Sequence, residues 1–388
     1  MSRNNSANNK LWFRASQFSA FVRSAISIAP LVGLFAVGCG GGSGMQNPPP
    51  PPPPPTFATI DVAEAGTTSE QGTFALEIND DGVVAGYFID PSGIIHGFVQ
   101  NSAGEITIVD VPVNGNLGTE IDSIDASGDT AGFYFDSQDE EHSFVRAADG
   151  TITTFDPPNS SSGAQSINGG TVAGGYVDVN GAHGYLRGPD GTFTTFDPTG
   201  DPTQVRIVIP YAINASGAVA GAYIDSAEVH HSFFRDVNGS ITILDAPGAG
   251  TAANEGTELV SMNTGDVIVG GINVGVVNGI GKTHCVIRAA GGTYSVFDPP
   301  QSGAQSSFTE AINEGGFVVG TYRDSNLVRH GFLRESDGTF VSFDDPQAAQ
   351  LPLSSVNQGT VPLGINASGA VVGFYSDANG VRHGFTWQ

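Results

Sequence analysis

The chain has 388 residues, of which 14 are Lys or Arg and 39 are Asp or Glu, so its formal net charge is -25. This length allows one large domain or about two to three ordinary ones. The acidic excess repels nucleic acid and anionic lipid, so we expect no nucleic-acid partner and favour cations or basic partners.

Residues 1–38 have the pattern of a signal peptide. They hold four basic residues and no acid, and their apolar run AISIAPLVGLFAVG is too short for a membrane span. The run ends in Ala36-Val37-Gly38-Cys39, which resembles the lipobox of bacterial lipoproteins, although Ala36 stands where leucine is usual. The resemblance implies that Cys39 is lipidated and becomes the first mature residue. Without the leader, 14 − 4 = 10 basic residues face 39 acidic ones, and the net charge is about -29.

Residues 39–56 are predicted to be a tether that follows the lipidated cysteine. They are rich in glycine and contain eight consecutive prolines, which hold a spacer of about 25 Å in the polyproline II conformation. Gly40 takes the place of the aspartate that resembles an inner-membrane retention signal. We therefore expect a lipid-anchored outer-membrane protein, on either the periplasmic or the cell-surface side.

Residues 57–388 are self-similar. Segments such as VAGYFID and VVGFYSD share a glycine, and successive shared glycines are 42 to 53 residues apart. These glycines are Gly86, Gly132, Gly174, Gly221, Gly270, Gly320 and Gly373. Short alternating segments in repeats of this length are typical of four-stranded propeller blades. The sequence therefore predicts an all-β protein with one seven-bladed β-propeller domain over residues 57–388.

The last repeat is incomplete. It ends after its third predicted strand, in RHGFTWQ, whereas TFATIDV near the start of the domain resembles the fourth strand of the other repeats. We predict that this N-terminal strand, residues 57–61, completes the last blade beside the C-terminal strands. Closure by both termini removes an exposed sheet edge.

A histidine begins the third strand of each repeat, and an aspartate 14 residues later ends the fourth strand. The tight hairpin between them places the two residues opposite each other, within reach of a hydrogen bond. The predicted pairs are His96–Asp110, His142–Asp156, His183–Asp197, His231–Asp245, His284–Asp298 and His330–Asp344, with His383–Asp61 across the junction of the termini.

Two other polar positions recur. The second strand ends in Asp90, Asp136, Asp178, Asp225, Asp324 or Asp377, and the first strand ends in Asn79, Asp125, Asn168, Asn214, Asn263, Asn313 or Asn366. A histidine between carboxylates can bind a metal or act as a general base. A site repeated in nearly every blade is instead predicted to hold the fold together. We therefore predict structural pairs, with no catalytic residue and no metal.

The connections into each first strand and those between the second and third strands vary in length, and both lie on one rim of the predicted ring. Binding normally uses variable loops on a rigid scaffold. The stretch DSQDEEH gathers Asp136, Asp139, Glu140 and Glu141, predicted contacts for a cation or ligand; a solvated acidic loop is the alternative. His230, outside the repeated pattern, is predicted to lie in a loop.

No complete calcium-binding loop, no Cys-x-x-Cys motif and no Ser-His-acid order is present in the sequence. We predict no cofactor, and calcium is the one ion that the acidic composition leaves open. Cys285 lies in the apolar stretch HCVI, so we expect a buried, unreactive thiol without a disulfide partner.

The repeated unit AIN..G.VVG.Y.D......HGF.R..DGT...FD.P resembles the HAF-family extracellular repeats of bacteria. The resemblance rests on a histidine–small–phenylalanine step, as in His96-Gly97-Phe98 and His383-Gly384-Phe385. It implies a propeller-like fold and an exported location, and it carries no biochemical activity.

Three functional hypotheses follow. The leading one is a monomeric, non-enzymatic binding or scaffold module of the cell envelope, whose ligand is an unidentified glycan, peptide or protein. It predicts exposed apolar anchors on the variable rim and no convergent group of titratable side chains in any single blade. The rival is an envelope enzyme, a glycan-active hydrolase or lyase at the mouth of the central channel, with perturbed carboxylates or histidines in only one or two blades. A passive spacer or surface-layer component is the third.

Overall fold

The computed structural model describes residues 55–277, 280–303, 306–349 and 359–388. The predicted signal peptide and most of the predicted tether, including Cys39, lie outside the described residues. In the described part of the chain, no helix is long and apolar enough to cross a membrane.

The described chain is all-β, with strands β1 to β28 and two short 3-10 helices, η2 (Pro202–Gln204) and η3 (Pro300–Ser302). Apart from β1 (Phe57–Ile60), the strands follow one another in antiparallel sets. Each set is named below by its first strand.

The first four sets have the following bounds. The β2 set comprises β2 (Gly72–Ile78), β3 (Val84–Ile89), β4 (Ile95–Gln100) and β5 (Ile106–Val109). The β6 set comprises β6 (Gly118–Ile124), β7 (Thr130–Phe135), β8 (Glu141–Arg146) and β9 (Ile152–Phe155). The β10 set comprises β10 (Ser161–Asn168), β11 (Thr171–Asp178), β12 (Gly181–Arg187) and β13 (Phe193–Phe196). The β14 set comprises β14 (Val205–Ile213), β15 (Val219–Asp225), β16 (His230–Arg235) and β17 (Ile241–Leu244).

The remaining sets have the following bounds. The β18 set comprises β18 (Gly256–Met262), β19 (Ile268–Val277), β20 (Ile280–Arg288) and β21 (Tyr294–Phe297). The β22 set comprises β22 (Ser307–Ile312), β23 (Val318–Arg323), β24 (Arg329–Arg334) and β25 (Phe340–Phe343). The β26 set comprises β26 (Gly359–Ile365), β27 (Val371–Ser376) and β28 (Arg382–Trp387).

The hairpin between the third and fourth strands is tight and alike in the sets. In the β22 set, the amide of Glu335 donates to the carbonyl of Thr339 at 2.8 Å, and the amide of Gly338 donates back to the carbonyl of Glu335 at 2.9 Å. Gly338 has φ 92°, a left-handed conformation that glycine adopts without a steric cost. This turn fixes the register of the two strands, so Gly331 pairs with Phe343.

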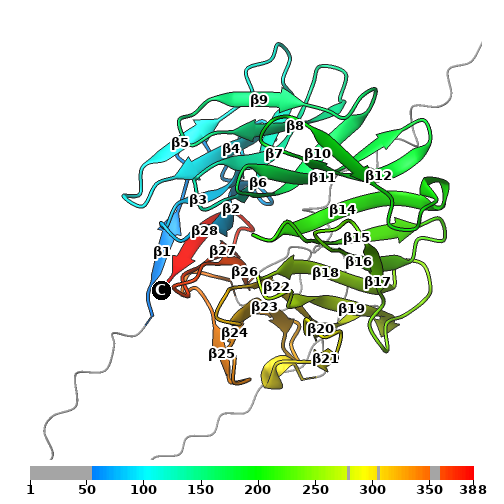
Figure 1. The fold of residues 1–388 in the computed structure, drawn as a ribbon. Helices are drawn as coiled ribbons and strands as arrows, with labels where there is room; N and C mark the ends of the chain where they lie inside the picture. The colour runs from blue at the N-terminus through cyan, green and yellow to red at the C-terminus, as the bar shows by residue number, and fades with distance from the viewer. Residues whose placement is uncertain (1–54, 278–279, 304–305, 350–358) are drawn as a thin grey trace, which may run out of the picture.

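The first strand of each set lies innermost. Each first strand packs against the first strand of the next set, and β26 packs against β2. In Figure 1 the labels of β2, β6, β18, β22 and β26 lie toward the middle of the molecule, whereas the fourth strands β5, β9, β17, β21 and β25 lie at its edge. The first strands are therefore the ones that can share a central site.

The two ends of the described chain lie side by side (Figure 1). Strand β1 pairs antiparallel with β28, from Phe57 opposite Trp387 to Ile60 opposite Gly384. The pairing ends in two hydrogen bonds between the backbones of Thr56 and Gln388, at 2.7 and 3.1 Å. Strand β2 then approaches β28 in parallel, with Gly72 opposite Arg382.

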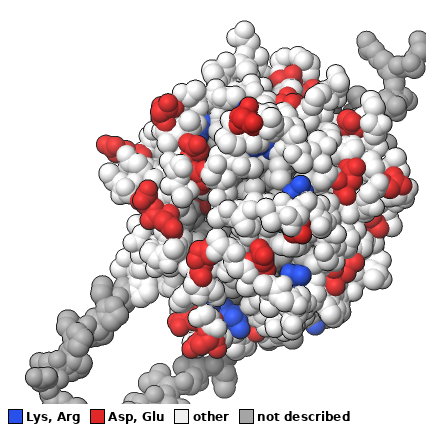
Figure 2. Space-filling view, viewed as in Figure 1, with Lys and Arg blue, Asp and Glu red and all other residues white. Residues whose placement is uncertain are grey.

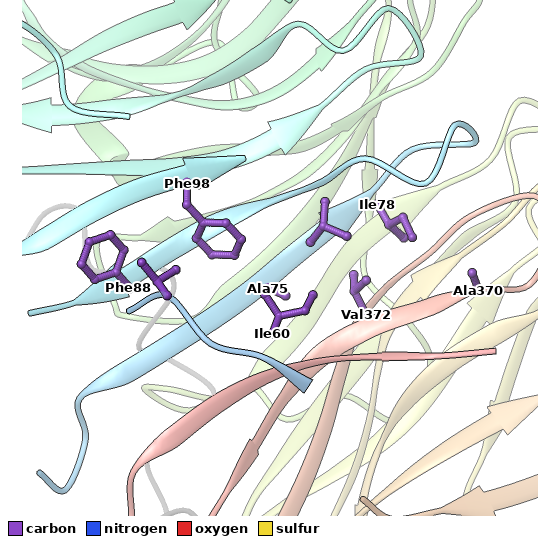
Figure 3. Close-up of a cluster of buried hydrophobic side chains, with 9 residues drawn as sticks. Ile60, Ala75, Ile78, Phe88, Phe98, Ala370 and Val372 are labelled. Carbon is purple, nitrogen blue, oxygen red and sulfur yellow. The ribbon is translucent and has the colours of Figure 1, made fainter. Parts of the chain in front are cut away.

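A buried apolar cluster joins the N-terminal strand to the β2 and β26 sets (Figure 3). Ile60 of β1 packs with Ala75 and Phe98 of the β2 set and with Val372 of the β26 set. Burial of such side chains stabilises a fold by about 1.5–3 kcal/mol each. The core at this junction therefore depends on residues more than 300 positions apart in the chain.

Candidate functional site

The predicted histidine–aspartate pairs all lie within hydrogen-bond distance. Nδ1 of each repeated histidine lies 2.6–2.9 Å from a carboxylate oxygen of its aspartate. The pairs are His96–Asp110, His142–Asp156, His183–Asp197, His231–Asp245, His284–Asp298, His330–Asp344 and His383–Asp61. The last pair spans the junction between β28 and the end of β1.

The aspartate after the second strand holds the turn that leads to the histidine. One carboxylate oxygen of Asp90 accepts the amides of Ser92 and Ile94, both at 2.8 Å. Its other oxygen lies 3.7 Å from Nε2 of His96. Corresponding contacts recur at Asp136, Asp178, Asp225 and Asp324, at 3.2–3.7 Å from the histidine.

The histidine rings also pack on the second strand. Rings at Phe88, Tyr134, Tyr176, Tyr223, Tyr322 and Tyr375 have centroids 4.7–5.2 Å from the neighbouring histidine ring. Since the arrangement repeats in set after set, it fits a role in holding hairpins together. The hydrogen bond to Asp245 raises the pKa of His231, and the bond to Asp61 does the same for His383.

The residue that ends each first strand links neighbouring sets. The side-chain amide of Asn79 donates to the carbonyl of Asp125 at 3.1 Å, and that of Asn366 donates to the carbonyl of Asn79 at 3.1 Å. Corresponding bonds run from Asn214 to Asn263, from Asn263 to Asn313 and from Asn313 to Asn366, at 2.9–3.4 Å. Asn168 ends β10 at the same place in its own set. These predicted fold determinants thus join one set to the next.

Three further positions are aligned by the strand pairing and differ from set to set. The first pairs with the residue after the shared glycine and is occupied by Phe74, Glu120, Gly163, Ile209, Glu258, Phe308 and Val361. The second lies in the register shift of the first strand and is occupied by Leu76, Asp122, Gln165, Tyr211, Val260, Glu310 and Leu363. The third precedes the repeated histidine and is occupied by Ile95, Glu141, Ala182, His230, Thr283, Arg329 and Arg382. Each position is apolar, small or uncharged in some sets, so the fold itself does not require a titratable residue there.

The β6 set has an acid at all three positions. We call Glu120, Asp122 and Glu141 the acidic group. Glu120 and Glu141 are only 4% and 5% exposed, and Asp122 is half-buried. Burial raises the pKa of Asp122 and of Glu141 well above the usual range, and the charges of neighbouring acids raise both further. Asp122 and Glu141 therefore retain protons at pH values where an exposed carboxyl has lost them.

A second set-specific group spans the β14 and β18 sets. The Tyr211 hydroxyl donates to Oε1 of Glu258 at 2.6 Å, and Nδ1 of His230 lies 3.7 Å from Oε2 of Glu258. Burial acts to raise the pKa of Glu258, but its contacts with His230 and Tyr211 outweigh burial and lower it. We call these three residues the Tyr–Glu–His network.

Glu310 of the β22 set lies near this network. Burial raises its pKa to about 7, although the positive charge of Arg329 acts in the opposite direction. A carboxyl with such a pKa can donate or accept a proton near neutrality.

The predicted loop position of His230 is wrong. His230 begins β16, opposite Ile224, and pairs in parallel with Gly256 of the next set. This parallel approach is the physical reason that a residue without a repeated partner meets Glu258. The hydrophobic pattern of one strand contains no information about this contact between neighbouring sets.

The predicted acidic contacts of the β6 set are separated by the structure. One oxygen of Asp136 accepts the amides of Gln138 and Glu140 at 2.8 and 2.9 Å, and Asp139 and Glu140 are exposed in the same turn. Glu141 instead begins β8 and lies within reach of the charges of Asp122 and Glu120. Among the described residues, no three or more His, Cys, Asp or Glu side chains are grouped so that they could hold a metal ion.

The prediction that no single blade holds a convergent group of titratable side chains is wrong, because the β6 set holds the acidic group. The missed residues, Glu120, Asp122, Tyr211, Glu258 and Glu310, carry a signal in the sequence. They are polar at repeat positions where other repeats have Phe, Val or Leu. An alignment of the first strands alone would have singled them out.

The variable rim does expose apolar side chains. Ile94, Leu117, Val179 and Val276 lie in or beside the connections on that rim and are 39%, 49%, 99% and 71% exposed. Figure 2 shows acidic side chains scattered over one face of the molecule, with few basic ones. Cys285 is fully buried, and burial raises the pKa of its thiol, as expected for an unreactive cysteine.

No family model matches the chain, and no curated protein matches it. Solved structures do. Streptogramin B lyase superposes with a TM-score of 0.52 and 14% identity, over 86% of this chain and 98% of that chain. Catalytically inactive virginiamycin B lyase from Staphylococcus aureus with quinupristin superposes with a TM-score of 0.53 and 14% identity, over 86% of this chain and 99% of that chain. The β-propeller domain of the Trilobed protease from Pyrococcus furiosus superposes with a TM-score of 0.53 and 9% identity, over 83% of this chain and 95% of that chain.

At these identities the likeness shows the fold alone. The described chain therefore has an all-β fold like that of β-propellers, which confirms the predicted class at this level.

Proposed function

We propose that residues 57–388 form a closed, seven-bladed β-propeller in which β1 completes the β26 set. The pairing of β1 with β28 supports this, as does the packing of β26 against β2. Hydrogen bonds between neighbouring sets support it too, including the one from Asn366 to Asn79. The HAF-type repeat motif is a further part of the proposal.

The same proposal includes export and a lipid anchor at Cys39 of an outer-membrane protein. The support is the order of a basic stretch, an apolar run, the lipobox-like Ala36-Val37-Gly38-Cys39 and a proline-rich tether. A metabolic label with a fatty-acid analogue tests this anchor. The wild-type chain is expected to incorporate the label and a Cys39→Ser variant to lack it; equal labelling of the two would contradict lipidation.

The proposed function is specific binding of an envelope ligand at the first strands. The binding hypothesis predicted no such group in a single blade, but the acidic group is the observation that now carries it. Glu120 and Glu141 are buried and Asp122 is half-buried, at three aligned positions where the repeat does not require an acid. Burying ionisable groups costs stability, and unusual pKa values gather at functional sites. A passive spacer gains nothing from such a group.

A thermal-shift screen of the full chain against glycans, peptides and divalent ions tests this function. A selective, saturable rise of the melting temperature is expected in the wild type, and it should be absent from an Asp122→Asn variant. Glu140→Gln, in the exposed turn of the same set, serves as the matched control and should keep the response. A ligand that stabilises wild type and Asp122→Asn equally would place binding elsewhere and contradict the proposed site.

The Tyr–Glu–His network favours a second candidate function, an envelope enzyme that acts on a glycan. Glu258 can orient His230 through Nδ1 and leave Nε2 as a general base, while Glu310 can supply a proton. Turnover of a ligand found in the screen, lost in Glu258→Gln and kept in Glu140→Gln, would support this candidate over binding alone. Turnover unchanged in Glu258→Gln would contradict it.

A further inference from the structure

The acidic group of the β6 set can be compared with the residues at the same positions of the neighbouring β10 set. In the β10 set, the three aligned positions hold Gly163, Gln165 and Ala182 instead of acids. Both sets nevertheless form four antiparallel strands with the same kind of histidine–aspartate pair. Three acids in one set are therefore an addition to the scaffold and not a part of it.

Within the acidic group, Glu141 has a buried carboxylate oxygen without a hydrogen-bond donor. Its side chain is 5% exposed, and its Oε1 atom is buried with no hydrogen-bond partner. A buried polar atom without a partner costs about 1–3 kcal/mol, and more when the group is charged. The nearby charges that affect Glu141 are those of Asp122, Glu120 and Asp156, all of which are negative when ionised.

A cation placed between these carboxyl groups would remove that cost. An ammonium group donates three hydrogen bonds and a guanidinium group donates five, and either is attracted to carboxylates. Asp122 is half-buried and can meet a group that enters from solvent. The strong net negative charge of the whole chain also attracts cations.

We propose that Glu120, Asp122 and Glu141 bind an organic cation that presents a primary ammonium or guanidinium group. The inference rests on the proposed function, because it names the ligand class of that same site. The lack of a metal-holding group among the described residues favours an organic cation over a divalent metal at this place. Binding requires ionised carboxylates, so affinity rises with pH as Asp122, which Glu77 also faces, and Glu141, which Asp156 also faces, lose their protons.

Calorimetry on the full chain at low ionic strength tests the proposal with defined probes. These are spermidine, N-acetyl-lysine methylamide, N-acetylarginine methylamide and N-acetylnorleucine methylamide, the last being a neutral match for lysine. At least one cation is expected to bind, with the norleucine probe at least ten-fold weaker. Tighter binding of spermidine would indicate a free polyamine, and tighter binding of an amino-acid probe would indicate a basic peptide.

Two variants separate a binding role from a structural one. Asp122→Asn and Glu141→Gln are each expected to weaken cation binding at least ten-fold, whereas Glu140→Gln stays within two-fold. Free Asp122→Asn is also expected to melt at a higher temperature than the free wild type, because a neutral amide costs less to bury. A residue that served the fold would lower the melting temperature instead.

Several results would overturn the inference: no probe cation binds, the norleucine probe binds equally well, or calcium chloride binds while the organic cations do not. Failure of the inference can be told from failure of the proposed function. If only the ligand class is wrong, another ligand in the thermal-shift screen still stabilises the wild type and not Asp122→Asn. If the function is wrong, no ligand distinguishes these two proteins.

Discussion

The β6 and β10 sets have the same strand order and the same histidine–aspartate pair, yet they differ at the three aligned positions. The β6 set buries acids there, and the β10 set has Gly163, Gln165 and Ala182. The comparison separates two kinds of residue. Those shared by the sets hold the scaffold, and those peculiar to one set cost stability and form the proposed binding site.

The largest expected effect concerns a shared residue. Gly72 has φ 121°, and a Cβ atom built there would lie 1.9 Å from the carbonyl oxygen of Arg382. Gly72→Ala should therefore lower the free energy of unfolding by about 3 kcal/mol or more, since it adds backbone strain to a clash at the junction of the two ends. Denaturant unfolding measures the loss.

Gly93→Ala is the matched control for this prediction. Gly93 also has positive φ, at 85°, but a Cβ atom there would meet nothing within 4 Å. A loss of about 1 kcal/mol is expected from conformation alone. Similar losses for the two variants would show that the approach of β2 to β28 is not a tight contact.

The next effect concerns pH and a set-specific acid. Burial raises the pKa of Glu310 to about 7 from its ordinary value of 4.5. Between these values the folded chain binds more protons at Glu310 than the unfolded chain does, so stability falls as pH rises from about 4.5 to 7. Glu310→Gln should flatten this fall by about 1–3 kcal/mol, since each pKa unit corresponds to about 1.4 kcal/mol.

Urea unfolding of wild type, Glu310→Gln and the control Glu140→Gln at several pH values measures the slopes. The control should keep the slope of the wild type, because Glu140 is exposed. If Glu310→Gln also keeps it, then Glu310 ionises as an exposed acid does and takes no special part in the site.

The smallest effect concerns the pair that spans the junction. Asp61→Ala removes the 2.9 Å contact with His383, and we expect a loss of about 1 kcal/mol in the free energy of unfolding. Glu140→Ala, an exposed acid outside the pairs, should lose less than about 0.5 kcal/mol. Equal and negligible losses would argue against a stabilising pair at the junction.

Much of the scaffold could be predicted from local patterns. Alternating apolar residues and glycine turns indicated the strands, and the described residues are all-β in a propeller-like fold. The 14-residue spacing between histidine and aspartate lies within one hairpin, whose turn fixes the register. Each such pair has a contact of 2.6–2.9 Å for this reason.

The candidate site was harder to predict because its members belong to different hairpins. His230 was expected in a loop, yet it begins a strand that approaches Gly256 of the next set. Glu141 was grouped with its sequence neighbours Asp139 and Glu140, but alternation along β8 turns it away from them and into the interior.

The sequence by itself determined the repeat, the strands and the polar pairs, because strand alternation and hairpin turns act between residues close in the chain. Only the tertiary structure decided which acids are buried together and which histidine meets a glutamate. Those outcomes depend on how one set packs against the next, and the resulting loss of solvent, rather than residue type, shifts the pKa values that mark the site.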